Sequence, residues 1–308
     1  MFYVAHRLFA AHDRALGALV ARRLAEEVGA GQVFLPFCDT DEEDLVAEVK
    51  GRRLFELDRQ RLAGLSGLLA VLHGPSLDDG VCMELGYAAA RNVPVVVLTT
   101  DFITHGLNEH GPELLFPDPL VQIVATEVVR LDKLGPRPAA TANRFSVFGL
   151  RNTDQITAAV DAAIERLIDL ASALRTPATP DPSVKRVAFC EPSPYWTDES
   201  WGHITDRLHD RGYQVQVANR FSASDPIAAA VGDWAAATSA DLLITDVSGP
   251  ETPPGAAMMT GACAALGQPI LARQQALSWT FAHGREPNWR NLMIQYAVAA
   301  RFSNGQPP

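Results

Sequence analysis

Three carboxylates lie close together between two strongly apolar runs of the sequence: Asp78, Asp79 and Glu84. The apolar runs, residues 68–72 and 93–98, are typical of buried parallel strands, so the stretch between them is expected to form an acidic loop and then a helix. The start of such a helix lies at the carboxyl edge of the sheet, where open α/β folds bind small molecules. Glu84 is therefore a candidate nucleophile or base. The alternative is a first-turn residue that the helix dipole favours.

One flanking segment carries a fourth carboxylate, and another is expected to cover this edge of the sheet. Residues 54–65 have the apolar spacing of a helix that carries Asp58, for which the alternative is a solvated charge paired with Arg61. Residues 99–119 form a connection longer than compact domains usually contain, which we expect to cover the site. The apolar run within 121–131 predicts a further strand.

The composition excludes several classes of protein. The chain has 308 residues, of which 47% are hydrophobic and 20% charged, and a net charge of -10. These values are typical of a globular protein of two domains, and the negative charge argues against a nucleic-acid surface. No run reaches the length of a membrane span, and the first residues lack the pattern of a signal peptide. We expect a cytoplasmic protein that binds neither nucleic acid nor a membrane.

Cysteine and histidine spacing points to no metal. The four cysteines are far apart and form neither a CxxC pair nor a Cys/His ligand set, which favours reduced and mostly buried thiols. The histidines are scattered, and His6, His73 and His105 are the ones near the expected edge. A packing or surface role is the alternative for each.

A Pro-rich segment, residues 175–185, divides the chain. Residues 1–174 alternate strands and helices, and residues 186–308 restart the same pattern. We therefore expect an α/β fold of two flavodoxin-like, Rossmann-like parallel sheets. Residues 240–245 match 66–71 at an offset of 174, and residues 255–265 match 80–90 at an offset of 175, which predicts a tandem duplication with one residue inserted in a loop.

The second copy lacks the three carboxylates of the first. Met259 stands in the place of Glu84, and prolines at 253 and 254 stand in the places of the two aspartates. A carboxylate that only capped a helix would have little reason to disappear together with the other two. We interpret the first copy as active and the second as a spent copy.

The motif Asp78, Gly80 and residues 84–88 (Glu-Leu-Gly-Tyr-Ala) resembles the signature of the nucleoside 2-deoxyribosyltransferase family. Residues 2–9 resemble the first strand and loop of that family, and Asp58 lies at the spacing of its base-contacting aspartate. The resemblance covers about the first 130 residues well and the second half more loosely.

The resemblance implies a role for each matching residue. Glu84 would attack the anomeric carbon of a nucleoside and form a covalent glycosyl intermediate. Asp58 would manage the proton of the departing base, Asp78 would bind sugar hydroxyls, and Tyr3 would orient Glu84. The substrates would be a nucleoside and a nucleobase, and neither a metal nor an organic cofactor is required.

In this family an Asn of a neighbouring subunit, in an Asn-Leu-Met segment, completes each site. Here the segment is residues 291–293 in the second half, while residues 121–123 occupy roughly that place in the first. We expect the halves to pack as an intrachain pseudo-dimer with Asn291 over the site of Glu84; a chance occurrence of the segment is the alternative. The other expected substrate-binding residues are Asp79, Gly80, His6 and Arg7.

Arg7 departs from the usual small loop of the family, and a cation there would suit a 5′-phosphate; a surface ion pair is the alternative. The leading function is 2-deoxyribosyl transfer between nucleobases. The alternatives are hydrolysis of the N-glycosidic bond of a nucleoside or its 5′-monophosphate, and a nucleotide-binding or sensing module without catalysis. Further self-association of the chain stays open.

Overall fold

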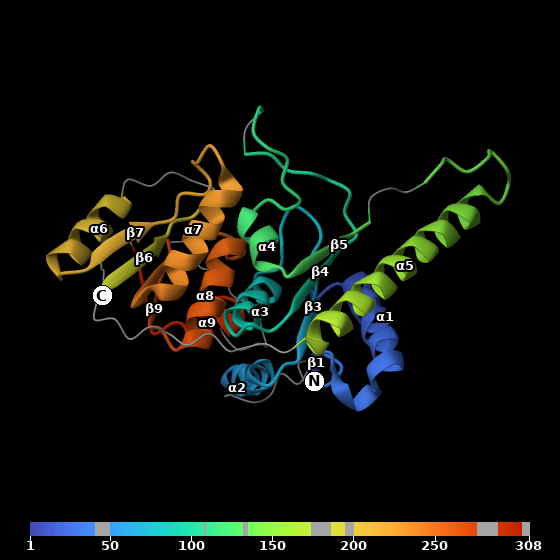
Figure 1. Ribbon diagram of the computed structural model, residues 1–308, viewed down its shortest axis with the longest axis horizontal. Coiled ribbons are helices and arrows are strands. Elements are labelled where there is room, and N and C mark those ends of the chain that lie inside the picture. The colour runs from blue at the N-terminus through green and yellow to red at the C-terminus, as the bar shows by residue number, and fades with distance from the viewer. Residues whose placement is uncertain are drawn as a thin grey trace.

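The computed structural model describes residues 1–40, 50–107, 109–131, 135–173, 186–194, 200–275 and 289–303. Within these residues the chain forms two five-stranded parallel sheets, one in each half (Figure 1). The predicted linker, residues 175–185, lies outside the described residues. No described helix is both long enough and apolar enough to cross a lipid bilayer.

The two sheets have the same strand order. The first runs β2-β1-β3-β4-β5, and the second, read in the matching direction, runs β7-β6-β8-β9-β10. This is the flavodoxin-like order, so the predicted fold class is confirmed. The strands of the first half are β1 Phe2–Ala5, β2 Val33–Phe34, β3 Gly67–Val71, β4 Val95–Thr99 and β5 Glu127–Arg130. Those of the second are β6 Val187–Glu191, β7 Gln214–Val217, β8 Leu242–Asp246, β9 Ile270–Arg273 and β10 Ala300–Phe302.

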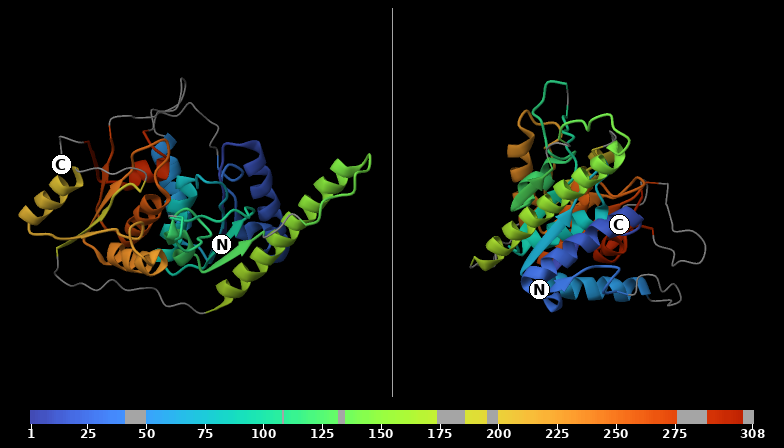
Figure 2. Two further views of the ribbon diagram at one scale, coloured as in Figure 1. Left: turned by 90° about the horizontal axis from the view of Figure 1, so that it is seen from above. Right: turned by 90° about the vertical axis from the view of Figure 1, so that its right-hand side faces the viewer.

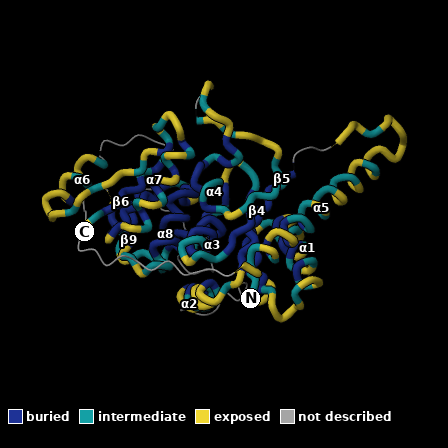
Figure 3. Tube along the Cα trace, in the orientation of Figure 1, coloured by how far each residue is buried: buried dark blue, intermediate teal, exposed yellow. Residues whose placement is uncertain are grey.

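Helices cover both sheets and join them. In the first half they are α1 Ala11–Val28, α2 Lys50–Ala63, α3 Asp79–Ala90, α4 Pro119–Val124 and α5 Arg144–Ser172. In the second they are α6 Ser200–Asp210, α7 Pro226–Ser239, α8 Pro254–Leu266 and α9 Leu292–Ala297. α1 and α5 lie side by side on the outer face of the first sheet (Figure 2). α3 and α8 pack together between the sheets, where the residues are most deeply buried (Figure 3).

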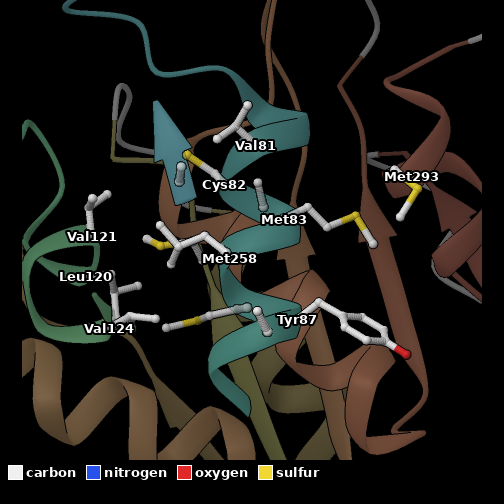
Figure 4. Close-up of a cluster of buried hydrophobic side chains, with 14 of the residues drawn as sticks. Val81, Cys82, Met83, Tyr87, Leu120, Val121, Val124, Met258 and Met293 are labelled. Carbon is white, nitrogen blue, oxygen red and sulfur yellow. The ribbon is translucent and has the colours of Figure 1, made fainter. Parts of the chain in front are cut away.

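The contact between α3 and α8 is reciprocal. A Cβ atom at Gly86 would overlap the carbonyl oxygen of Met258, and a Cβ atom at Gly261 would overlap the carbonyl oxygen of Met83. Both pairs of equivalent residues are 175 positions apart, so each half presents the same surface to the other, as in an isologous dimer interface. Met83, Met258 and Met293 lie in one apolar cluster drawn from both halves (Figure 4). The expected intrachain pseudo-dimer is therefore the arrangement that the structure has.

The offset of 174 predicted for the third strand is wrong. Leu68 of β3 pairs with Val95, and Leu243 of β8 pairs with Ile270, so the strands are equivalent at an offset of 175. The offset matches that of α3 and α8, and no loop insertion is needed. An apolar run buried on both faces does not specify register, because a shift of one residue still gives apolar side chains on each face. Packing against the helices between the sheets sets the register instead, since Leu68 and Leu243 both lie in the apolar cluster that contains residues of α3 and α8.

The strand predicted within residues 121–131 is also wrong in its first part. Residues 119–124 form the helix α4, and β5 begins at Glu127. The Asp118 carboxylate accepts a hydrogen bond from the backbone N–H of Leu120 at 2.9 Å, and Pro119 occupies the first helical position. These two start signals outweigh the β-branched residues that follow.

Candidate active site

Glu84 lies one turn into α3, at the carboxyl edge of the first sheet. The helix begins after Asp78, whose Oδ1 accepts a hydrogen bond from the backbone N–H of Val81 at 3.0 Å. The Glu84 side chain is directed to β1, where the Tyr3 hydroxyl donates a 2.6 Å hydrogen bond to Glu84 Oε1. Tyr3 is fully buried and its ring contacts that of Phe34 with centroids 5.1 Å apart. The carboxylate is thus held by a rigid strand rather than by a loop.

Asn291 comes to this place from the second half of the chain. It precedes α9, and its Oδ1 accepts a hydrogen bond from the backbone N–H of Met293 at 3.0 Å. Its Nδ2 lies beside Gly80, where an added Cβ atom would come within 2.6 Å of that nitrogen. The absence of a side chain at Gly80 therefore lets an amide of one half approach the first turn of α3 in the other, one helical turn from Glu84.

Asp58 lies on α2 and connects to Tyr3 through two neighbours. Arg61 Nη1 is 3.8 Å from Asp58 Oδ1, and the Arg61 guanidinium lies over the Phe34 ring at 4.0 Å. Phe34 in turn contacts Tyr3. The ion pair with Arg61 that the helical spacing allowed is present. The Asp58 side chain is mostly buried, with 13% of its surface exposed.

Asp79 contacts the second half. Its Oδ2 accepts a hydrogen bond from the backbone N–H of Thr252 at 3.1 Å. Burial raises the pKa of Asp79, and the hydrogen bond from Thr252 and the charge of Arg290 oppose that rise. Arg290 donates to the carbonyl oxygens of Val247 and Gly249. Asp79 therefore binds the loop before α8, where the sequence had suggested a substrate contact.

His6 and Arg7 follow β1 and diverge. The buried His6 ring packs against Gly17 of α1, the helix on the face of the sheet opposite α3. Arg7 stays at the site: its Nη2 donates to the carbonyl oxygen of Ser76 at 2.7 Å, and its Nε lies 3.7 Å from Asp78 Oδ2. His6 was expected to touch substrate, and its packing against α1 instead makes it a support for the strand end.

The pKa of the Asp78 carboxyl group is shifted. Burial, and then the charge of Asp79, raise its pKa to about 7, while the hydrogen bond from Val81 and the charge of Arg7 oppose the shift. Near neutral pH this group is therefore divided between a hydrogen-bond donor and an acceptor form, and either form can bind a sugar hydroxyl.

The corresponding place in the second half is filled by a side chain that sequence reasoning missed. Gly255 is the counterpart of Gly80, and the Arg220 guanidinium lies against it, fully buried. Arg220 makes two hydrogen bonds to Asp118, at 2.9 and 3.0 Å, and binds two more buried carboxylates. These are Glu191, at 2.5 and 3.0 Å, and Asp233, at 3.3 Å. Nothing in the sequence around Arg220 signals this network, because its partners lie on three other segments of the chain.

The position of Asp118 shows that the segment matched to residues 291–293 was chosen wrongly. It precedes α4 as Asn291 precedes α9, and each side-chain oxygen caps its helix in the same way. The counterpart of residues 291–293 is therefore 118–120, three residues before the segment first matched to it. Asp118 meets Arg220 at Gly255, as Asn291 meets Gly80.

A metal centre is not built into the part of the chain that the structure describes. There, no three His, Cys, Asp or Glu side chains are grouped so as to hold a metal ion. The chemistry available at the described edge is that of carboxylates, a tyrosine hydroxyl, an amide and a guanidinium.

A comparison with protein families finds a match in the first half of the chain. Residues 2–121 match the family model described as nucleoside 2-deoxyribosyltransferase. No protein with a curated description matches the chain. Among solved structures, a 2-desoxiribosyltransferase from Leishmania mexicana is 15% identical, with a TM-score of 0.30, over 35% of this chain and 85% of that one. A conserved protein from Enterococcus faecalis V583 is 19% identical, with a TM-score of 0.33, over 54% of this chain and 96% of that one.

Proposed function

Because the first half of the chain, over residues 2–121, belongs to the nucleoside 2-deoxyribosyltransferase family, we propose that the protein transfers a 2-deoxyribosyl group between nucleobases. The observation that carries the proposal is the 2.6 Å hydrogen bond by which Tyr3 holds Glu84 at the start of α3. A carboxylate oriented in this way, at the edge where α/β folds bind ligands, is suited to nucleophilic attack.

The first step is formation of a glycosyl-enzyme. A carboxylate oxygen of Glu84 attacks the anomeric carbon of a 2′-deoxynucleoside, and the electron pair of the N-glycosidic bond passes to the ring nitrogen of the base. Asp58, whose carboxylate lies beside Arg61, relays a proton from solvent to that nitrogen and is a carboxylate again afterwards. The sugar is then bound to Glu84 as an ester, and the free base leaves.

The second step reverses the first with another base. A ring nitrogen of the incoming base attacks the anomeric carbon, the carbon–oxygen bond to Glu84 breaks, and its electron pair returns to the carboxylate. The proton of the incoming nitrogen passes by way of Asp58 to solvent, so the enzyme is restored. Asp78 and Asn291 bind sugar hydroxyls in both steps, and Tyr3 keeps Glu84 in line with the anomeric carbon.

In this proposal the chain is a tandem duplication with one site. The active unit is residues 1–174, and residues 186–308 are a spent copy that contributes Asn291. The equal strand orders and the reciprocal glycine contacts of α3 and α8 support it. So does Arg220, which fills the second place that could have been a site. A cytoplasmic location is part of the proposal, since the four cysteines are free thiols.

Two other functions fit some of the same observations. Water in place of the second base would make the protein an N-glycoside hydrolase of nucleosides or their 5′-monophosphates. A chain that binds nucleotides without cleaving them would be a sensing module. The retained contact between Tyr3 and Glu84 favours catalysis over sensing, because a binding module has no need of a positioned nucleophile.

The test is a chromatographic assay of purified protein with a 2′-deoxynucleoside, with and without a second free base. We expect a new nucleoside in the presence of the base, and a loss of at least about 10³-fold in Glu84→Gln. Met259→Leu is the matched control in the second half, because this volume-conserving change costs less than about 1.5 kcal/mol of stability. Free sugar without exchange would favour the hydrolase. Exchange that persists in Glu84→Gln would overturn the proposal, and binding without turnover would favour the sensing module.

A further inference from the structure

The ion pair of Arg61 and Asp58 differs from a second pair on the same helix. Arg59 and Glu56 of α2 lie 2.8 Å apart with about half of each side chain exposed, as in an ordinary surface pair. Arg61 Nη1 and Asp58 Oδ1, at the same spacing along the chain, lie 3.8 Å apart, and both atoms are buried. That separation is too long for a direct hydrogen bond. Stability alone therefore does not explain the pair, because buried charges stabilise a protein only when they are closely hydrogen-bonded.

Phe34 holds the guanidinium of Arg61 in place. The guanidinium carbon lies 4.0 Å from the centre of the Phe34 ring, which is close for a cation–π contact. Phe34 also pairs with Tyr3 in the register of β1 and β2, and the two rings lie 5.1 Å apart at an angle of 45°. One buried ring therefore contacts both the cation beside Asp58 and the tyrosine that donates to Glu84.

The two oxygens of the Asp58 carboxylate have different surroundings. Oδ1 is buried on the side of Arg61, whereas the side chain as a whole has 13% of its surface exposed. A proton from solvent therefore reaches the carboxylate through Oδ2. The last torsion of an aspartate side chain has a broad energy minimum, so the plane of the carboxylate turns easily unless a neighbour holds it. The charge of Arg61 holds one oxygen and thereby fixes the direction in which the other points.

We propose that Arg61 is a positioning residue of the proton relay, which fixes the Asp58 carboxylate with Oδ2 directed to the departing base. Phe34 keeps Arg61 in register with Tyr3, so the carboxylate that serves the base and the carboxylate that attacks the sugar keep one spacing. Arg61 itself gives up no proton, because the guanidinium stays charged and the proton comes from solvent by way of Asp58. The proposal rests on the proposed function of the Glu84 site.

A fault in the proton relay should affect most strongly the bases that leave poorly. A fluorine substituent withdraws electrons from the base, stabilises the negative charge that develops on it, and reduces its need for a proton. Two matched pairs of substrates differ in this one atom: 2′-deoxyuridine with its 5-fluoro derivative, and 2′-deoxyadenosine with its 2-fluoro derivative. The ratio of kcat/KM within a pair therefore reports the relay, whereas a general loss of structure lowers both members equally.

The experiment measures this ratio in Arg61→Met, whose side chain keeps an apolar contact with the Phe34 ring but has no charge. We expect kcat/KM to fall about 100-fold for the unsubstituted nucleoside and about tenfold for the fluorinated one, so that the ratio rises about tenfold. Asp58→Asn should raise the ratio likewise, and adding Arg61→Met to it should raise the ratio no further. Phe34→Leu, which leaves the charge but removes the ring, should raise the ratio by a smaller factor, and it replaces Arg61→Met as the test if that variant does not fold.

Arg59→Met is the control, because it removes an arginine of the same helix whose ion pair is exposed; kcat/KM for both members of a pair should equal that of the wild type. Equal falls for the two members in Arg61→Met, or no fall in either, would overturn the inference. If the wild-type protein turns over none of these nucleosides, the proposed function fails. Crystal structures of the wild type and of Arg61→Met then decide the inference separately: it stands if the Asp58 carboxylate has turned in the variant, and it fails if the orientation is the same.

Discussion

The two halves of the chain share a fold but differ in what lies at its centre. Tyr3 of β1 pairs with Leu68, and Phe189 of β6 pairs with Leu243, so these aromatic residues are counterparts. The first half has a hydroxyl there, and a glutamate to receive its hydrogen bond. The second has a phenyl ring, and Met259 in the place of the glutamate. The fold is therefore compatible with either a polar site or an apolar core at the same position.

The helix caps show the same difference more closely. Asp118 and Asn291 both begin a short helix by accepting a backbone N–H, which either residue type does equally well. What differs is the neighbour: Asp118 binds Arg220, and Asn291 lies beside Gly80. Both residues cap a helix, and this role is common to the two halves. The second contact of each residue depends on the half that faces it.

The largest difference between the halves should be seen in stability. Arg220→Met leaves three buried carboxylates without their common partner, so we expect a loss of about 3–5 kcal/mol in the free energy of unfolding. Urea denaturation measures it. Arg166→Met is the control, because its ion pair with Glu127 is exposed and should be worth about 1 kcal/mol or less. Equal losses in the two variants would show that the second centre is not held together by Arg220.

Replacing the helix cap of the second half by that of the first should separate the effect of this residue on stability from its effect on catalysis. Asn291→Asp keeps the cap of α9 but places a carboxylate beside Asp78, which should lower kcat/KM about tenfold through charge repulsion. The same repulsion should lower the free energy of unfolding slightly, although the cap of α9 is kept. Asp225→Asn, a cap exchange at α7, is the control and should leave kcat/KM unaffected. An unaltered kcat/KM in Asn291→Asp would mean that the amide plays no part in the reaction.

The smallest expected effect is on the pH dependence of stability, and buried carboxyl groups of both halves contribute to it. Burial raises the pKa of Asp78 to about 7 in the first half, and burial raises that of Glu191 to about 7 in the second, where Arg220 opposes the rise. Between about pH 4 and 7 the folded chain keeps protons that the unfolded chain has lost. The free energy of unfolding should therefore fall as the pH rises through this range, by up to about 1.4 kcal/mol per pH unit for each proton.

Asp78→Asn should make this fall shallower, because asparagine keeps the cap of α3 but does not titrate. Urea denaturation at several pH values between 4 and 7 measures the slope. If the slope is the same in the variant and in the wild type, Asp78 does not hold a proton near neutral pH.

Much of the fold could be predicted because its signals are local. The apolar runs of the central strands, and the spacing from Asp78 to Ala88, come from a few consecutive residues each. The repetition of these patterns was enough to predict two flavodoxin-like sheets, and the family resemblance added the pseudo-dimer; the structure confirms both. The family resemblance of the first half followed from the same short motif.

The features that could not be predicted depend on contacts between distant segments. The offset of 175 between β3 and β8 follows from which face of each strand packs toward α3 and α8, and an apolar run is compatible with two registers. Arg220 fills the second centre because three segments bring carboxylates to one guanidinium, and Asp79 turns to Thr252 because the loop before α8 lies against it. Local patterns specify periodicity and helix ends, whereas the partner of a buried charge is specified by the packing of the two halves.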